Sequence, residues 1–213
     1  MAADDWYRGT DWTAEVQEHF ENKLGRARRA NRAQYLRIKG VELVASPDPA
    51  ARRAGRDLLR RVVAEYPSDV LQATWAHYDL AASLAEDGDL DEAAEHYSAA
   101  LAADRPDRSA AVGLAEVIVQ ARWEHRYEEA LNLLVGVGSE DARAPLPAVR
   151  FRWNLVAARL AERLGKRDDA RELAGLALRC LDETQSPFRR HRSVGLATAD
   201  PRTRRELKKL AKK

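Results

Sequence analysis

The sequence predicts an all-α protein whose helices form consecutive antiparallel pairs, and three observations lead to this fold class. Apolar residues recur with helical spacing along most of the chain, and short polar turns separate the helical stretches. A strand is typically encoded by alternating β-branched residues between two turn signals, and the sequence contains no such stretch. Similar segments also recur along the chain, as expected for a protein built from repeated supersecondary units. We therefore expect repeated helix pairs and no β-sheet.

Caps and turns place the individual helices. Asp11 is a favourable N-cap for the first helix, which carries an apolar stripe at i+4 spacing. The second helix contains residues 35–43 and ends at the Ser-Pro-Asp-Pro turn of residues 46–49. Asp200 and Pro201 form an N-cap followed by proline at the first helical position, which predicts a last helix just after them. The helices expected in between cover 50–65, 69–86, 90–103, 108–124, 127–136, 147–164 and 168–183.

Composition limits the class of protein. The chain has 213 residues, 45% apolar and 33% charged, so it is long enough to bury a sizeable core and too apolar for global disorder. Its single cysteine, Cys180, excludes a disulfide framework and a multi-cysteine metal site. The richest apolar run, 112–119, is much shorter than the roughly 20 residues of a membrane span. The first residues are too acidic and polar for a signal peptide, so we expect a cytoplasmic protein.

Three segments of the chain are similar to one another: 86–97, 123–134 and 163–174. Each contains a turn, then an acidic pair, then a small alanine, and these alanines (Ala93, Ala130 and Ala170) are 37 and 40 residues apart. Carboxylates at the start of a helix interact favourably with the helix dipole, and a small residue lets the helix lie close to the preceding one. The pattern therefore indicates repeated helix pairs that pack closely.

The segment 88–101, GDLDEAAEHYSAAL, followed by Asp104 and Pro106, resembles the second half of a tetratricopeptide repeat. The segments 127–130 and 165–170 resemble the same half-repeat. This resemblance implies a tetratricopeptide-like α-solenoid, which is a right-handed superhelical array of antiparallel helix pairs, here about four of them.

The resemblance covers residues 35–185 and suggests three parts of the chain. Residues 1–34 are expected to form an N-terminal tail and an amphipathic capping helix. Residues 35–185 are expected to form the helical repeat domain, and residues 186–213 a basic C-terminal segment with a short helix.

In the family that the chain resembles, the first helix of each pair lines the concave face of the superhelix. The corresponding helices here, 69–86, 108–124 and 147–164, give this groove an aromatic end and a basic end. Such a groove suits a protein or peptide segment with an apolar anchor and a carboxylate. In the alternative interpretation, the aromatic side chains belong to the core and the arginines form a solvated face. The residues expected to bind the partner are Trp75, Tyr78, Glu86, Arg122, Arg152, Arg159 and Arg163.

The net charge of +2 conceals blocks of opposite charge. Residues 23–61 contain 12 basic and 3 acidic residues, whereas residues 62–104 contain ten carboxylates and neither Lys nor Arg. Residues 186–213 contain ten basic and two acidic residues. We expect the acidic second helix pair to face either the basic first pair of the same molecule or the basic tail of a second copy, which would make a homo-oligomer.

The basic C-terminal segment has three interpretations: a helix that caps the end of the array, a contact with nucleic acid, and a contact with an anionic membrane surface. The second gives an alternative function, a nucleic-acid-associated protein that binds phosphates through the blocks 23–61 and 186–213. The residues expected to contact nucleic acid are Arg189, Arg190, Arg192, Arg204, Arg205, Lys208 and Lys209.

Motifs for catalysis, metal binding or cofactor binding are not visible. The five histidines are scattered, and none lies in a His-Glu-x-x-His motif. Residues 136–139, Gly-Val-Gly-Ser, lack the preceding strand and the following lysine of a phosphate-binding loop, so we interpret them as a helix stop. We therefore expect no enzyme activity, no cofactor and no metal. The leading functional prediction is a non-catalytic scaffold that binds a protein segment.

Overall fold

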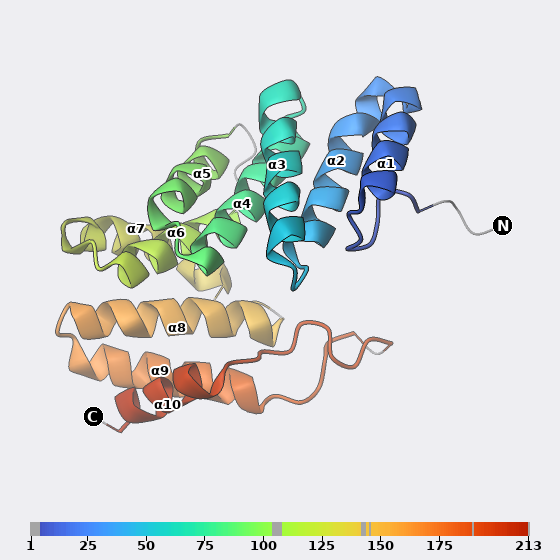
Figure 1. Ribbon diagram of the computed structural model, residues 1–213. Coiled ribbons are helices and arrows are strands. Elements are labelled where there is room, and N and C mark those ends of the chain that lie inside the picture. The colour runs from blue at the N-terminus through green and yellow to red at the C-terminus, as the bar shows by residue number, and fades with distance from the viewer. Residues whose placement is uncertain (1–4, 104–107, 142–143, 145, 189, 213) are drawn as a thin grey trace. The chain divides into compact units, whose positions relative to one another are not determined.

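A computed structural model describes residues 5–103, 108–141, 144, 146–188 and 190–212 (Figure 1). These residues form α-helices and one short 3-10 turn, η1, and no strand occurs among them, so the all-α prediction is confirmed for this part of the chain. The chain divides into two compact units, Met1–Ala110 (unit 1) and Ala111–Lys213 (unit 2). The elements are α1 (Ala14–Arg26), α2 (Arg29–Val44), α3 (Pro49–Glu65), α4 (Val70–Asp87), α5 (Leu90–Ala102), α6 (Arg108–Ala121), η1 (Glu124–Arg126), α7 (Tyr127–Asp141), α8 (Pro147–Arg163), α9 (Arg167–Asp182) and α10 (Pro201–Leu210).

Several helices begin at a residue whose side chain caps the free N–H groups of the first turn. Asp48 accepts hydrogen bonds from the N–H groups of the first turn of α3, which has proline at its first position. Asp200 does the same at α10. The predicted cap of the first helix is wrong by two residues, because Thr13 rather than Asp11 accepts the N–H of Val16. Asp11 instead lies in the segment before α1, where its carbonyl accepts a hydrogen bond from Lys39.

In unit 1, α2 packs on α3, α3 on α4, and α4 on α5 (Figure 1). A close helix contact joins Gly40 of α2 and Gly55 of α3. A Cβ atom added at Gly55 would lie 2.7 Å from the carbonyl oxygen of Gly40 and 2.8 Å from the backbone nitrogen of Val44. Only glycine therefore fits at this crossing point.

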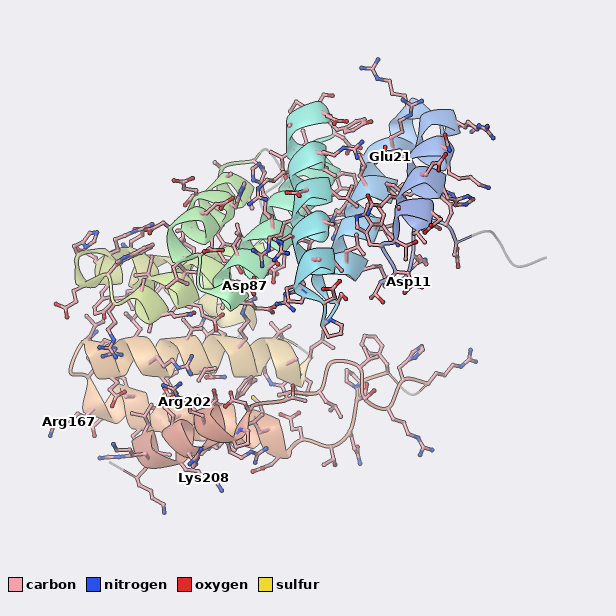
Figure 2. All side chains as sticks on the ribbon, in the orientation of Figure 1. Asp11, Glu21, Asp87, Arg167, Arg202 and Lys208 are labelled. Carbon is pink, nitrogen blue, oxygen red and sulfur yellow. The ribbon has the colours of Figure 1, made fainter. Side chains whose placement is uncertain are left out.

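Ion pairs connect the basic first half of unit 1 to its acidic second half. Arg37 of α2 contacts Asp79 of α4 at 2.7 Å, and Arg60 of α3 contacts Glu92 of α5 at 2.8 Å. The buried Arg56 also pairs with Asp87, near the end of α4 (Figure 2). The expectation that the acidic second helix pair faces the basic first pair of the same molecule is thus confirmed.

Lys39 holds the N-terminal segment of unit 1 against α2. Its ammonium group donates to the carbonyls of Arg8, Gly9 and Asp11 at 2.9–3.3 Å, and the residue is only 1% exposed. Burial lowers the pKa of Lys39, against the opposing effect of Asp11 and Glu42. The three carbonyls satisfy all three donors of the ammonium group, which explains how a lysine can be buried here.

In unit 2, α8 packs on α7 and α9, and α10 packs on α9 (Figure 1). Leu207 and Leu210 of α10 are buried in one apolar cluster with Phe151, Leu155 and side chains of α9. The C-terminal helix thus covers the end of the α8–α9 pair, as the capping interpretation predicts.

The predicted helix stop at residues 136–139 is wrong, because α7 continues to Asp141. A glycine inside a helix costs only about 1 kcal/mol relative to alanine. The buried Val137 and a hydrogen bond from the indole of Trp153 to the carbonyl of Leu134 hold this part of α7 on α8. Tertiary contacts therefore outweigh the local preference.

Candidate functional site

A hollow of about 600 Å³ lies in unit 2, between α6, α8 and the start of α10. Its size is in the range of ordinary ligand pockets, about 300–1,000 Å³. Four arginines and four carboxylates dominate the polar part of its wall. The lining residues are Glu116, Val119, Gln120, Arg122, Val156, Arg159, Glu162, Arg163, Asp200, Arg202, Thr203 and Glu206.

Arg159 of α8 is bound by the C-terminal helix of its own chain. Its Nε and one terminal nitrogen donate to the two carboxylate oxygens of Glu206, each at 2.9 Å. Burial acts to lower the pKa of Arg159, but the hydrogen bond and charge of Glu206, together with the charges of Glu116 and Asp200, outweigh burial and raise this pKa. This bidentate pair fixes α10 against α8 and neutralises one of the four arginines of the hollow.

The carboxylates of the hollow also have partners within the chain. Glu116 accepts a hydrogen bond from Arg152 at 3.0 Å, beside the hollow. Asp200 accepts from the hydroxyl and N–H of Thr203 and from the N–H of Arg202, and these hydrogen bonds lower its pKa. Glu162 also interacts with another residue. The negative charges of the wall are therefore already engaged.

Three arginines that line the hollow are exposed: Arg122, Arg163 and Arg202. Arg202 lies in the first turn of α10 (Figure 2). In the part of the chain that the structure describes, none of their guanidinium groups takes part in an ion pair or hydrogen bond. They are thus available to an anionic ligand, and each offers up to five N–H donors.

The same turn follows α4, α6 and α8. Within two positions of the end of each helix, a single residue adopts a left-handed backbone conformation: Gly88 (φ 90°), Arg122 (φ 57°) and Gly165 (φ 73°). In each turn the N–H of this residue donates to the carbonyl three positions earlier, and the next N–H donates to the carbonyl five positions before itself, at 2.9–3.3 Å. This is the Schellman pattern, whose left-handed position is normally glycine.

Arg122 departs from the other two turns. It is the only non-glycine residue with a positive φ among the described residues. A left-handed backbone costs a residue with a Cβ atom about 1 kcal/mol. Arg122 thus keeps a strained conformation at the rim of the hollow, where the equivalent positions have glycine. Strained backbone of this kind is enriched at functional sites.

The structure brings together three of the predicted groove residues, Arg122, Arg159 and Arg163, around this one hollow, and Arg152 lies beside it through Glu116. The other three lie on α4 in unit 1. Trp75 is 36% exposed and has the guanidinium of Arg37 4.8 Å from its ring centre. Tyr78 is half-buried with its ring against the buried Tyr97, and Glu86 is exposed. 

Sequence reasoning missed Arg202, Glu206 and Asp200 as parts of this site. The Asp-Pro cap at residues 200–201 predicted the helix, but not where it packs. Glu206 reaches Arg159 across 47 residues of sequence. A single sequence carries no signal for such a contact, apart from the one carboxylate in an otherwise basic helix.

Helix α10 has a buried apolar side and an exposed basic side. Arg205, Lys208 and Lys209 are exposed, and Lys208 is labelled in Figure 2. A guanidinium nitrogen of Arg204 lies 3.8 Å from a carboxylate oxygen of Asp182. In the preceding segment, Arg190 and Arg192 are exposed, whereas Arg189 lies outside the described residues. Of the residues predicted to contact nucleic acid, those that the structure describes are therefore largely exposed to solvent.

Comparisons with protein families, with curated proteins and with solved structures find no match for this chain. In its described part, none of the helices is long and apolar enough to span a membrane. The described residues also contain no group of three or more His, Cys, Asp or Glu side chains placed to hold a metal ion.

Proposed function

We propose that this protein is a non-catalytic scaffold and that unit 2 binds an acidic segment of a partner protein in the hollow between α6, α8 and α10. One observation carries the proposal: a hollow whose carboxylates are engaged within the chain is lined by three arginines that have no partner among the described residues. An incoming carboxylate can form charge-assisted, bidentate hydrogen bonds with these guanidinium groups. 

We also infer that the helix pairs form a tetratricopeptide-like array with the right-handed superhelical twist of that family. The recurring turn after α4, α6 and α8 supports this inference, because an identical hydrogen-bond pattern at the same place in successive helix pairs is typical of repeat proteins. In such an array the hollow faces the concave side, where these proteins bind extended segments.

The proposal can be tested by selecting binders from a library of random short peptides on the full chain. We expect the selected peptides to be rich in Asp and Glu. Their affinity, measured by fluorescence anisotropy, should fall about tenfold or more in the Arg163→Glu variant, because a rim guanidinium is replaced by a repelling charge. Arg167→Glu is the matched control: this residue is exposed on α9, outside the hollow (Figure 2). Equal affinities for the two variants would contradict the proposal.

A second candidate function is supported by the exposed basic side of α10. Because the apolar side of this helix is buried, Arg205, Lys208 and Lys209 point to solvent and can contact the phosphates of a nucleic acid. Binding of generic double-stranded DNA or RNA should then fall steeply with salt and be lost in Lys208→Glu/Lys209→Glu. Binding that persists in this variant would exclude the helix as the contact surface.

A further inference from the structure

We propose that the hollow of unit 2 contains a subsite for a phosphate monoester, formed by Arg122, Arg163 and Arg202, and that Arg122 determines its specificity. This inference rests on the proposed binding site and deepens it: the partner segment would carry a phosphorylated side chain. The three residues line one hollow and have no partner in the described part of the chain.

The pair between Arg159 and Glu206 shows what a single carboxylate can do in this hollow. The carboxylate accepts two hydrogen bonds of 2.9 Å from one guanidinium and thereby uses both of its oxygens. Three further guanidinium groups need a ligand with more oxygens and more charge. A phosphate monoester offers three acceptor oxygens and between one and two negative charges at neutral pH, so its chemistry matches the three arginines better than a carboxylate does.

The backbone of Arg122 gives a second, independent reason. The turns after α4 and α8 form the same hydrogen bonds as the turn after α6, but they place Gly88 and Gly165 where the latter has Arg122. The turn itself therefore does not need an arginine, and glycine would fit it with less strain. What arginine adds at this position is a guanidinium at the rim of the hollow.

The test compares inorganic phosphate, O-phosphoserine and acetate as probes at constant ionic strength. Binding to the full chain is measured by calorimetry and by NMR of the arginine side chains. We expect phosphate and O-phosphoserine to bind at least about tenfold more tightly than acetate. This preference should disappear in Arg122→Gly, while the midpoint of thermal unfolding stays equal or rises, because glycine relaxes the left-handed turn.

Two results would overturn the inference. One is an equal affinity for phosphate and acetate in the unmodified protein. The other is an Arg122→Gly variant that keeps the preference, or that loses it only together with a lower unfolding midpoint, since the arginine would then be structural. Arg167→Gln, which removes an exposed arginine outside the hollow, controls for general charge.

The outcome is separate from that of the proposed function. Unphosphorylated acidic peptides that bind through Arg163 without any phosphate preference would support the scaffold and overturn the subsite. Comparing each selected peptide with its phosphoserine version then distinguishes the two sources of the phosphate group. Tighter binding of the phosphopeptide supports a phosphorylated partner, and tighter binding of O-phosphoserine or inorganic phosphate alone overturns that assignment.

Discussion

The two units of this chain use their charged residues differently. In unit 1, Arg37 of α2 and Arg56 and Arg60 of α3 pair with carboxylates of α4 and α5, so these charges hold neighbouring helix pairs together. In unit 2 the carboxylates of the hollow are engaged, but within the described part of the chain Arg122, Arg163 and Arg202 have no ion pair there. An almost neutral chain can thus use ion pairs to join helices in both units and still leave a cluster of arginines available for binding in one of them.

The largest effect is expected from Leu207→Ala in unit 2. Leu207 is fully buried between α10 and the α8–α9 pair. Its truncation leaves a cavity and should lower the free energy of unfolding by about 3 kcal/mol. Urea denaturation followed by circular dichroism measures this loss, and amide hydrogen exchange locates it.

Lys208→Ala is the control on the exposed side of the same helix, and it should change the free energy of unfolding by less than about 0.5 kcal/mol. If Leu207→Ala were as mild as this control, α10 would not be part of the core of unit 2. The hollow would then lack one of its walls, and the comparison between the units would fail.

In unit 1 the corresponding weak point is the crossing of α2 and α3. Gly55→Ala forces a Cβ atom against the backbone of Gly40 and Val44. We expect this overpacking to lower the free energy of unfolding by about 2 kcal/mol. Gly25→Ala is the matched control, because its Cβ would meet no atom within 4 Å near the end of α1. That variant should be as stable as the original or slightly more stable, since alanine favours the helix. Equal behaviour of the two variants would exclude a close helix contact.

The parts of this fold that could be predicted from sequence are those encoded locally. The pair Asp200-Pro201 marks the start of α10 correctly, because an N-cap and a first-turn proline act within a few residues. The turn at residues 46–49 likewise places α3, which begins at Pro49 with Asp48 as its cap, one residue before the predicted start. The continuation of α7 through Gly136 was not predictable, since contacts with α8 decide it. 

The turn after α6 shows the same limit in the candidate site. Alignment of the repeated segments places His125 opposite Gly88 and Gly165, whereas the hydrogen bonds place Arg122 there, because the short helix η1 precedes α7. Left-handed backbone is expected at glycine, so an arginine in that conformation gives no signal in a single sequence. Arg159 and Arg163 were predicted to lie on one helix face, but Glu206, the carboxylate partner of Arg159, comes from a distant segment.

The ion pair between Arg37 and Asp79 measures how strongly charge holds unit 1 together. The two side chains are 22% and 16% exposed, and their atoms are 2.7 Å apart. A double-mutant cycle with Arg37→Met and Asp79→Asn should give a coupling of about 1.5 kcal/mol. The pair of Arg171 and Asp168 in unit 2, exposed by 47% and 92%, should give only about 0.3 kcal/mol. Equal couplings would show that burial does not strengthen the pairs of unit 1.

The smallest effect concerns pH and the histidine pair of unit 1. The Nδ1 atoms of His77 and His96 lie 2.8 Å apart, so one ring must donate and the other must accept with a bare nitrogen. Burial lowers the pKa of both rings. For His77, the charge of the neighbouring His96 lowers the pKa further. For His96, the carboxylates of Glu92 and Glu95 act to raise the pKa, whereas Arg60 acts to lower it. The folded protein therefore binds fewer protons than the unfolded chain just below the ordinary histidine pKa of about 6.5.

Unit 1 should consequently lose stability as the pH falls from 7 through the ordinary histidine pKa of about 6.5. In this range the unfolded chain binds protons at these two histidines more readily than the folded protein does. Urea denaturation at several pH values between about 7 and 5.5 gives the slope, above the range where the carboxylates titrate. Replacing His96 with Gln preserves a hydrogen-bonding side chain but removes one of the two groups, so the slope should become clearly shallower. The exposed His19→Gln should leave it unchanged. The slope would be the same in all three proteins only if the pair titrated as freely in the folded unit as in water. Its half-buried position and the contact between the two rings, one on α4 and one on α5, argue against this outcome.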